Sequence, residues 1–183
     1  MRVIAGTARS MPLKTIEGMQ TRPTTDKIKE TLFNMLSFDI PSARFLDLFA
    51  GSGQIGIEAL SRGAEYAMFV EQNKKCIACI EDNLKFTKMF EKSDILKGDV
   101  FACIPRLRSY GKFDIIFADP PYAMERENDL LNGIYENDIL AEGGLIVIEA
   151  SVSRDLSFVD DTGFTVTKDK LYKNNRHIFL EKK

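Results

Sequence analysis

The sequence has little of the residue types that build disulfide frameworks, metal centres and histidine-based catalytic triads. Its 183 residues include three cysteines and one histidine. So few cysteines, in an odd number, do not make a disulfide framework, and we expect reduced thiols in the core of a cytoplasmic protein. Structural metal sites usually need about four ligands at recognisable spacing, so we expect no metal. The single histidine lies near the C-terminus, which argues against a Ser-His-Asp hydrolase.

Long apolar runs are missing as well. No stretch approaches the roughly eighteen apolar residues that a transmembrane helix requires, so we expect no membrane association. The N-terminal stretch MRVIAGTARS contains no extended apolar segment and does not resemble a signal peptide. Neither internal repeats nor low-complexity segments are present. Hydrophobic residues make up 44% of the chain and charged residues 28%, which is typical of a folded domain with a substantial core.

Positive and negative charges nearly balance overall, but positive charge is concentrated at the two ends. The net charge is −2. Residues 1–44 carry seven Lys or Arg against four Asp or Glu, and residues 168–183 carry six against two. The stretch between them carries twelve against twenty-one. Basic ends around an acidic middle favour an anionic partner such as nucleic acid, although solvated chain ends explain the same pattern equally well.

The segment before residue 44 forms a unit of its own in the sequence pattern. Residues 1–20 alternate loosely between apolar and polar types and predict a small hairpin or arm. In TRPTTDKIKETLFNML the apolar residues recur at helical spacing after Pro23 and a run of helix-start residues. Pro41 ends this part. We therefore expect an N-terminal hairpin and helix extension over residues 1–43 and a separate domain over residues 44–183.

From residue 44 onward, short apolar segments alternate with segments of helical periodicity. Such alternation predicts an α/β fold with a mostly parallel sheet and helices on both faces. The last segment, GFTVTKDKLYKNNRHIFLEKK, predicts an antiparallel hairpin that brings the sheet to seven strands. The expected strands are RFLDLFA, YAMFV, DILKGDV, FDIIFA, GLIVIEA and the two arms of the hairpin around Asn174 and Asn175. The expected helices are QIGIEALSRG with Gly63 as its C-cap, residues 73–89, and ENDLLNGIYENDIL.

Several of the expected strands end on residues that can bind ligands or take part in chemistry. In an open α/β sheet, ligands bind beyond the carboxyl ends of the strands. The first strand leads through Asp47 into the glycine turn at residues 51–53. Later strands end near Glu71, near Asp99 and at DPPY, residues 119–122. A lone aspartate after a strand is usually a turn former or a helix cap, so the inference of a ligand site rests on the whole set.

The glycines alone leave two classes of ligand open. Three of them, Gly51, Gly53 and Gly56, fit the G-x-G-x-x-G pattern of dinucleotide-binding proteins. Glu71 follows the first glycine by twenty residues, as the ribose-binding acid does in that pattern. Glycine permits a tight turn and the close approach of a ligand to the backbone in either case. Asp47 favours a cationic ligand, because a carboxylate so near the turn would repel a pyrophosphate.

The tetrapeptide DPPY is the sharper signal. Proline fixes its own φ near about −65° and holds the residue before it in an extended conformation. Asp119 and Pro120 each precede a proline, so they present a carboxylate and a main-chain carbonyl as stiff acceptors beside Tyr122. Such a cluster suits a planar amino group, whose two N–H bonds it accepts while the ring stacks on the attached heterocycle. The alternative is a strand-ending turn with a surface tyrosine.

Several segments together resemble a known enzyme family. LDLFAGSG, the acid after the second strand, GDV and DPPY, in this order, resemble class I S-adenosylmethionine-dependent methyltransferases that modify amino nitrogens. MRVIAGTARS, TRPTTDKIKETLFNML and RFLDLFAGSGQIGIEALSRGA make the chain similar to the bacterial RsmD-type enzymes. The resemblance covers nearly the whole chain. It implies a Rossmann-like methyltransferase domain, S-adenosylmethionine as cofactor, and methylation of guanine N2 in 16S ribosomal RNA or a small-subunit assembly intermediate.

The resemblance also implies a role for each motif. Asp119 and Pro120 would hold the amine, and Tyr122 would stack on the base. The cofactor-binding residues would be Asp47, Phe49, Ala50, Gly51, Ser52, Gly53, Glu71, Asp99 and Val100. The RNA-binding residues would be Arg9, Arg22, Thr24 and Lys27, with further phosphate contacts from Arg2, Lys14, Lys170, Lys173 and Arg176. One departure from the family is Lys173 after Tyr172, where glycine is usual.

Three rival functions stay open on the sequence. DNA adenine and protein glutamine methyltransferases resemble this chain in DPPY, but usually need a larger target-recognition region than the short N-terminal segment. An NAD-binding Rossmann protein would use the same glycines. A non-catalytic RNA-binding module would account for the basic ends.

Overall fold

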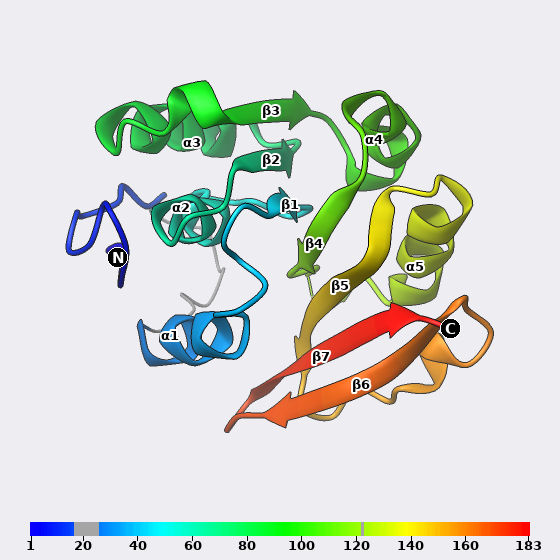
Figure 1. Ribbon diagram of the computed structural model, residues 1–183. Coiled ribbons are helices and arrows are strands. Elements are labelled where there is room, and N and C mark those ends of the chain that lie inside the picture. Colours follow the sequence, from blue (N-terminus) through cyan, green and yellow to red (C-terminus); the bar gives the residue numbers. More distant parts are fainter. Residues whose placement is uncertain (17–25, 122) are drawn as a thin grey trace.

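The protein is built on one seven-stranded sheet, which a computed structural model describes for residues 1–16, 26–121 and 123–183. The strands lie in the order β3-β2-β1-β4-β5-β7-β6 (Figure 1). Strands β1 to β5 run parallel, and β7 lies antiparallel between β5 and β6, which confirms the predicted α/β fold with a C-terminal hairpin. The strands are β1 (Arg44–Asp47), β2 (Tyr66–Glu71), β3 (Ser93–Lys97), β4 (Phe113–Ala118), β5 (Leu140–Ser151), β6 (Phe164–Leu171) and β7 (Asn175–Lys182).

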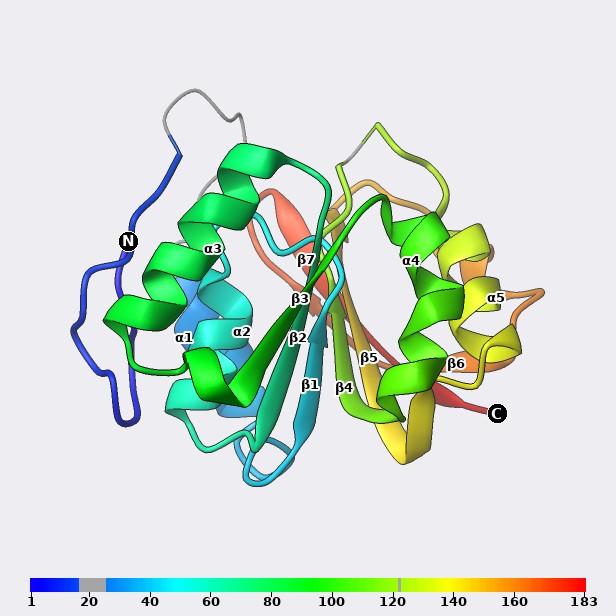
Figure 2. The ribbon, with the colours of Figure 1, turned by 90° about the horizontal axis from the view of Figure 1, so that it is seen from above.

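Helices cover both faces of this sheet (Figure 2). On one face lie α1 (Asp26–Met35), α2 (Gln54–Ser61) and α3 (Lys74–Phe86), and on the other lie α4 (Val100–Leu107) and α5 (Glu127–Glu136). Short 3₁₀ turns are η1 (Phe90–Lys92), η2 (Arg108–Tyr110) and η3 (Ser157–Val159). The strand neighbours Phe45 and Leu46 belong to separate hydrophobic clusters, because successive side chains of a strand point to opposite faces.

The order of the strands places a topological switch point at the centre of the sheet. β1 pairs with β2 on one side and with β4 on the other, so the chain crosses the middle of the sheet between β3 and β4. At such a switch point the connections diverge to opposite faces, and the carboxyl ends of the strands are left accessible to a ligand. Asp47 ends β1 and Asp119 directly follows β4, so both lie at this point.

The start of the chain is fastened to α2 by the buried carboxylate of Glu58. Its oxygens accept backbone N–H bonds from Ile4 at 2.8 Å and Ala5 at 3.0 Å. Lys29 Nζ lies 3.5 Å from Oε2, and Arg62 Nε donates to Oε1 at 2.8 Å. Burial lowers the pKa of Lys29, while the Glu58 charge opposes that shift. One side chain therefore ties both the first residues and α1 to the helix that follows the glycine turn.

The structure corrects the sequence prediction around β3. The third strand ends at Lys97, not near Asp99, and Asp99 instead caps a helix that was not predicted, α4. Pro105 lies inside α4, which is eight residues long. Proline usually ends a helix, so Pro105 argues against a helix over VFACIPRL. The helix forms because four of its side chains, Val100, Cys103, Ile104 and Leu107, are buried.

Smaller corrections concern element ends. The C-cap of α2 is Arg62, and the predicted cap Gly63 is the next residue, at φ 107°. The helices predicted over 73–89 and over ENDLLNGIYENDIL are shorter, and β5 begins at Leu140, before the predicted GLIVIEA. Within residues 1–16, the described part of the predicted N-terminal hairpin, there is one antiparallel bridge, between Arg2 and Pro12.

The cysteines lie in the core, as predicted. All three cysteines are free thiols in buried positions. Over residues 1–16, 26–121 and 123–183, no group of three or more His, Cys, Asp or Glu is arranged to hold a metal ion. In the same ranges, no helix has the length and apolar character that crossing a bilayer requires.

We predict that Glu58→Ala lowers the free energy of unfolding by about 3–5 kcal/mol, because Lys29 would stay buried without its charge partner. Two backbone N–H groups would also lose their acceptor. Glu65→Ala is the matched control, since Glu65 is exposed, and should change stability by less than about 0.5 kcal/mol. Urea unfolding followed by circular dichroism measures both. Equal stability of the two variants would contradict this role of Glu58.

Candidate active site

Asp47 places a buried carboxylate at the switch point. Asp47 is 1% exposed. Oδ2 accepts the backbone N–H of Gly56 at 3.3 Å, whereas Oδ1 has no hydrogen-bond partner among the described residues. A buried polar atom without a partner is costly and is normally found where a ligand or water completes the bonding. The free oxygen therefore marks a position for a donor, and a cation would match it best.

The glycine turn after β1 brings backbone groups to the same place. Gly51 and Gly53 have φ of 56° and 78°, a conformation that side chains with a Cβ rarely adopt. A Cβ at Gly51 would meet nothing within 4 Å, so the turn is open on that side. Gly56 has a different reason, because its Cβ would lie 2.3 Å from the Phe69 ring. The first two glycines thus shape the turn, and the third permits α2 to pack on β2.

Burial sets the charge state of Asp47. Desolvation raises the pKa of Asp47 to about 7, and the negative charge of Glu71 adds to the rise. The backbone N–H groups of Gly56 and Phe49 oppose these effects. In the absence of a cation, the ionised form of Asp47 is therefore energetically unfavourable at neutral pH. A bound ammonium or sulfonium would stabilise this ionised form.

Glu71 lies at the end of β2 and supports the glycine turn directly. Its Oε2 accepts the N–H of Gly51 at 2.9 Å. Oε1 accepts from Gln72 at 2.9 Å and from Asn73 at 2.8 Å. The carboxylate is thus held in one orientation, beside the turn, with lone pairs left on Oε2. Sequence reasoning gave Glu71 a ligand-binding role only, and its role in shaping the turn is a finding of the structure.

Asp99 and Val100 begin α4 on the other side of the turn. Asp99 Oδ1 accepts from Phe101 at 3.0 Å and from Ala102 at 3.3 Å, which makes it the N-cap. Val100 is buried and packs with the cluster beneath α4, and Phe49 is partly buried against the same cluster. The Arg126 guanidinium lies 3.8 Å from the centroid of the Phe101 ring. Apolar side chains thus flank the capping carboxylate.

Asp119 and Pro120 directly follow β4. Asp119 is partly buried and Pro120 is buried. Burial raises the pKa of Asp119 well above its ordinary value, and the charges of Glu149 and Asp47 raise it further. Asp119 is therefore an unusually basic carboxylate. The predicted stacking residue Tyr122 lies outside the described residues.

The register of the sheet brings the acids together. Asp47 pairs with Phe69 of β2 and with Phe117 of β4. Glu71 and Asp119 each follow one of these partners by two residues, which places their side chains on the same face as Asp47. The three carboxylates meet at one edge although they lie far apart in the chain.

The predicted RNA-binding residues are only partly described. Arg9 and Lys27 are exposed, while Arg22 and Thr24 lie outside the described residues. Among the further phosphate candidates, Arg2 pairs with Asp26 at 2.9 Å, and Lys14 pairs with Asp82 at 2.7 Å. Arg176 pairs with Asp169 and also donates to the Arg154 carbonyl. These last cations are shared with protein acceptors, so Arg9 and Lys27 remain the better-placed candidates.

Sequence reasoning missed Glu149 on β5. The pairing of Ala118 with Ile148 places Glu149 next to Asp119 across the two strands. Glu149 also bonds to His177 and Asn175 of β7. The available signal was an acid near the end of the otherwise apolar run GLIVIEA, and the partner on β7 depends on a register that the sequence does not display.

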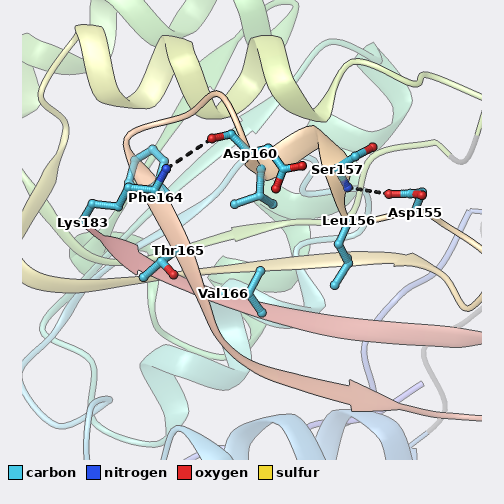
Figure 3. A pocket seen from close by; sticks show the side chains of 9 residues that line it. Asp155, Leu156, Ser157, Asp160, Phe164, Thr165, Val166 and Lys183 are labelled. Carbon is cyan, nitrogen blue, oxygen red and sulfur yellow. Dashed lines mark hydrogen bonds between the residues drawn. The ribbon is translucent and has the colours of Figure 1, made fainter.

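A surface hollow elsewhere on the molecule is separate from this site. The hollow in Figure 3 has a volume of about 420 Å³ and lies against η3 and β6. Lys183 Nζ there donates to the carbonyl of Thr162 at 2.8 Å, and Asp155 accepts from Ser157 at 2.6 Å. These polar groups already have partners. The hollow shares no residue with the switch point, and its lining is Asp155, Leu156, Ser157, Val159, Asp160, Phe164, Thr165, Val166 and Lys183.

Comparisons with known proteins identify the family of the chain. The family described as Conserved hypothetical protein 95 matches residues 1–181. The chain is 43% identical over 151 residues to YlbH of Bacillus subtilis, named as a candidate rRNA methyltransferase, covering 81% of this chain and 82% of that protein. It is 33% identical over 159 residues to ribosomal RNA small subunit methyltransferase D of Escherichia coli strain K12, covering 87% and 79%.

A solved structure shows the same fold. The candidate methyltransferase yhhF from Escherichia coli superposes with a TM-score of 0.87 and 30% identity. The match covers 100% of this chain and 98% of that one. The two chains therefore share one fold.

We predict that Asp47→Asn stabilises the ligand-free protein at pH 8 but not at pH 4. A carboxyl whose pKa rises from 3.8 to about 7 on folding binds a proton in the folded state between those values. Folded stability then falls as pH rises through that window. Asparagine removes this loss, on the order of 2–4 kcal/mol at pH 8.

Thermal unfolding at the two pH values measures the effect. Asp161→Asn is the control, since Asp161 is exposed and should give no pH-dependent difference. The same change in stability for Asp47→Asn at pH 4 and pH 8 would show that the carboxylate is not costly.

Proposed function

The chain belongs to the ribosomal RNA small subunit methyltransferase D family, and from that premise we propose that it methylates the exocyclic N2 of a guanine in small-subunit (16S) ribosomal RNA, with S-adenosylmethionine as methyl donor. The observation that carries the proposal is the meeting of two acceptor groups at one switch point. Asp47 has a buried oxygen without a protein partner in the described structure, and Asp119 with Pro120 offers stiff acceptors beside it.

The residues around the glycine turn fit S-adenosylmethionine. When bound, that molecule supplies an electrophilic methyl group on a sulfonium sulfur. Its ammonium matches the free oxygen of Asp47, whose cost at neutral pH a cation relieves. Glu71 is oriented to accept ribose hydroxyls, and Asp99 with Val100 offers an acceptor and an apolar surface to adenine. The methionine part would lie along the turn made by Phe49, Ala50, Gly51, Ser52 and Gly53.

The same carboxylates argue against a dinucleotide. The negative charge of Glu71 raises the pKa of Asp47. The negative charge of Asp47 in turn raises the pKa of Asp119. A pyrophosphate would add negative charge to this group of acids, whereas the sulfonium and ammonium groups of S-adenosylmethionine compensate it. The acidic middle of the chain is therefore consistent with the proposed cofactor.

Asp119 and Pro120 orient the nucleophile. The lone pair of a guanine amine is delocalised into the ring, so the amine is a poor nucleophile until it is held. The Asp119 carboxylate and the Pro120 carbonyl would accept its two N–H bonds and direct the lone pair toward the methyl group. Methyl displacement from a sulfonium needs mainly positioning and electrostatic preorganisation. Asp119, with its raised pKa, is then the nearest base for the proton that the amine must lose.

The RNA would approach over the N-terminal extension. We assign residues 1–43 to this RNA-contacting extension and residues 44–183 to the methyltransferase domain. Exposed Arg9 and Lys27 can contact phosphates, which fix the position of the RNA without reading its sequence. The target guanine must leave its stack before its amine can reach Asp119. A ribosomal substrate, naked or partly assembled, places the reaction in the cytoplasm.

We predict that Asp119→Asn lowers methyl transfer by about 10²–10⁴-fold, because the amide presents a neutral group and accepts no proton. Affinity for S-adenosylmethionine should change little, since Asp47 and the turn remain. Asp161→Asn is the matched control with wild-type activity expected. Labelled S-adenosylmethionine and small ribosomal subunits from a strain lacking this enzyme measure the rate, and nucleoside analysis identifies the product. A product other than N2-methylguanosine, or transfer to DNA alone, would contradict the proposed substrate.

We predict that affinity for S-adenosylmethionine depends on the charge of Asp47. Because the pKa of Asp47 is about 7 in the ligand-free protein, affinity should fall up to about tenfold per pH unit below that value. Asp47→Asn should bind weakly and lose this pH dependence. Isothermal titration calorimetry between pH 5.5 and 8.5, with the donor's own ionisation measured separately, tests both statements. A wild-type affinity that is flat across this range would show that Asp47 does not face the ammonium.

A further inference from the structure

A buried polar network lies directly behind Asp119. Glu149 and His177 face each other across β5 and β7, and His177 Nε2 lies 3.0 Å from Glu149 Oε2. Asn175 Nδ2 donates to the other oxygen, Oε1, at 2.6 Å. Tyr172 Oη lies 3.2 Å from His177 Nδ1. His177 is 0% exposed, Glu149 6% and Asn175 8%, so these three side chains are shielded from water, while Tyr172 is partly buried.

The chemistry of the donors fixes the direction of these hydrogen bonds. Burial and the Glu149 charge raise the pKa of Tyr172 to about 12, so Tyr172 keeps its proton at neutral pH. A neutral imidazole that donates from Nε2 to Glu149 accepts the Tyr172 hydroxyl at Nδ1, and this pairing satisfies both ring nitrogens. Asn175 can only donate through its Nδ2 group. The bonds from Asn175 and His177 end on the two oxygens of Glu149, so the carboxylate is held in one orientation.

The carboxylate held in this way acts on Asp119. Strand register places the two acids side by side, because Ala118 pairs with Ile148. The groups that face this position are Asp47 from β1, Glu149 from β5, and His177 with Tyr172 from the hairpin. Lys170 of β6 lies opposite His177 in register and is exposed. The charges that act most directly on Asp119 are those of Glu149 and Asp47, in that order.

We infer that Glu149 is a positioning residue for the proposed methyl transfer, and that the Tyr172–His177–Glu149 network exists to hold a negative charge beside Asp119. This inference rests on the proposed function. As the guanine N2 bonds to the methyl carbon, the carbon–sulfur bond breaks and its electron pair stays on sulfur. One N–H bond of the amine then breaks, and its proton forms an O–H bond on Asp119 before passing to water. The neighbouring charge makes Asp119 the stronger base for this step.

A purely structural network would brace the hairpin without changing Asp119. The two roles differ in what Glu149→Gln does. Glutamine keeps the size of the side chain and can still accept from Asn175, and the imidazole can exchange tautomers to suit the new amide. The negative charge is lost. We expect the protonation midpoint of Asp119 to move to lower pH by about one unit, because a like charge nearby is removed.

The test measures Asp119 directly and then its consequence. Carbon-13 NMR of aspartate-labelled, ligand-free protein, with the Asp119 signal assigned from Asp119→Asn, gives the midpoint for wild type and Glu149→Gln. Single-turnover methyl transfer to small ribosomal subunits gives the rate between pH 5 and 9. For Glu149→Gln we expect the acid limb to shift down by the same amount and the plateau rate to fall severalfold. Affinity for S-adenosylmethionine should not change.

Controls keep the inference falsifiable. Glu142→Gln removes an exposed charge from the same strand and should leave the midpoint and the rate profile as in wild type. If Glu149→Gln does not fold, Tyr172→Phe serves instead. It frees Nδ1, lets the imidazole take a second proton that offsets the Glu149 charge, and should shift the midpoint in the same direction.

Two outcomes are distinguishable. An Asp119 midpoint that is the same in wild type, Glu149→Gln and Tyr172→Phe overturns this inference, whatever the substrate is. Wild-type protein that transfers no methyl group to ribosomal guanine overturns the proposed function, while the NMR midpoints still report on the pairing of Glu149 with Asp119. A lower plateau with an unshifted acid limb would assign Glu149 a structural role only.

Discussion

The pairing of β1 with both β2 and β4 is the constraint on which the rest of this structure depends. Parallel strands end at the same edge, so every acid that follows a strand is brought toward the acids of its neighbours. β1 is also fully enclosed, with Phe45 and Leu46 in opposite hydrophobic clusters. A carboxylate at its end, Asp47, is therefore buried by the same packing that makes the sheet stable. The site and the core are consequences of one arrangement.

That arrangement places two buried carboxyl groups, whose ionised forms are unfavourable, at the centre of the sheet. Two carboxyls, Asp47 and Asp119, have raised pKa values because burial and neighbouring negative charges disfavour their ionised forms. Packing alone would favour neutral residues at both positions. The protein keeps the acids, and the glycine turn and Glu71 are built around them. Stability sacrificed in this way is typical of a binding site, where a ligand of opposite charge completes the electrostatics.

Much of this could be predicted from the sequence, and the reasons for success and failure are local. Alternating apolar segments and helical periodicity predicted the sheet, and the motifs at strand ends predicted the edge at which Asp47, Glu71 and Asp119 meet. The helix α4 was missed because Pro105 obscures its periodicity. The Glu149–His177 pair was missed because it depends on the register between β5 and β7. One residue of slip would turn each side chain to the other face, and no local pattern reports that choice.

Asp119, Glu149 and His177 lie on the same face of the sheet as α1, which belongs to the N-terminal extension. Phe117, Val147 and Phe179 share the hydrophobic cluster with Leu32 and Phe33 of α1. Asp119, Glu149 and His177 alternate with the intervening residues in the same phase as these side chains, so they lie on the α1 face of the sheet. Glu58 fixes the first residues and α1 to α2 on this face. An RNA held by the exposed cations of the extension would therefore lie on the face of the sheet that carries Asp119 and Glu149. Anchoring of the first residues and of α1 serves this geometry better than loose attachment, because the bound base must meet Asp119 in one orientation.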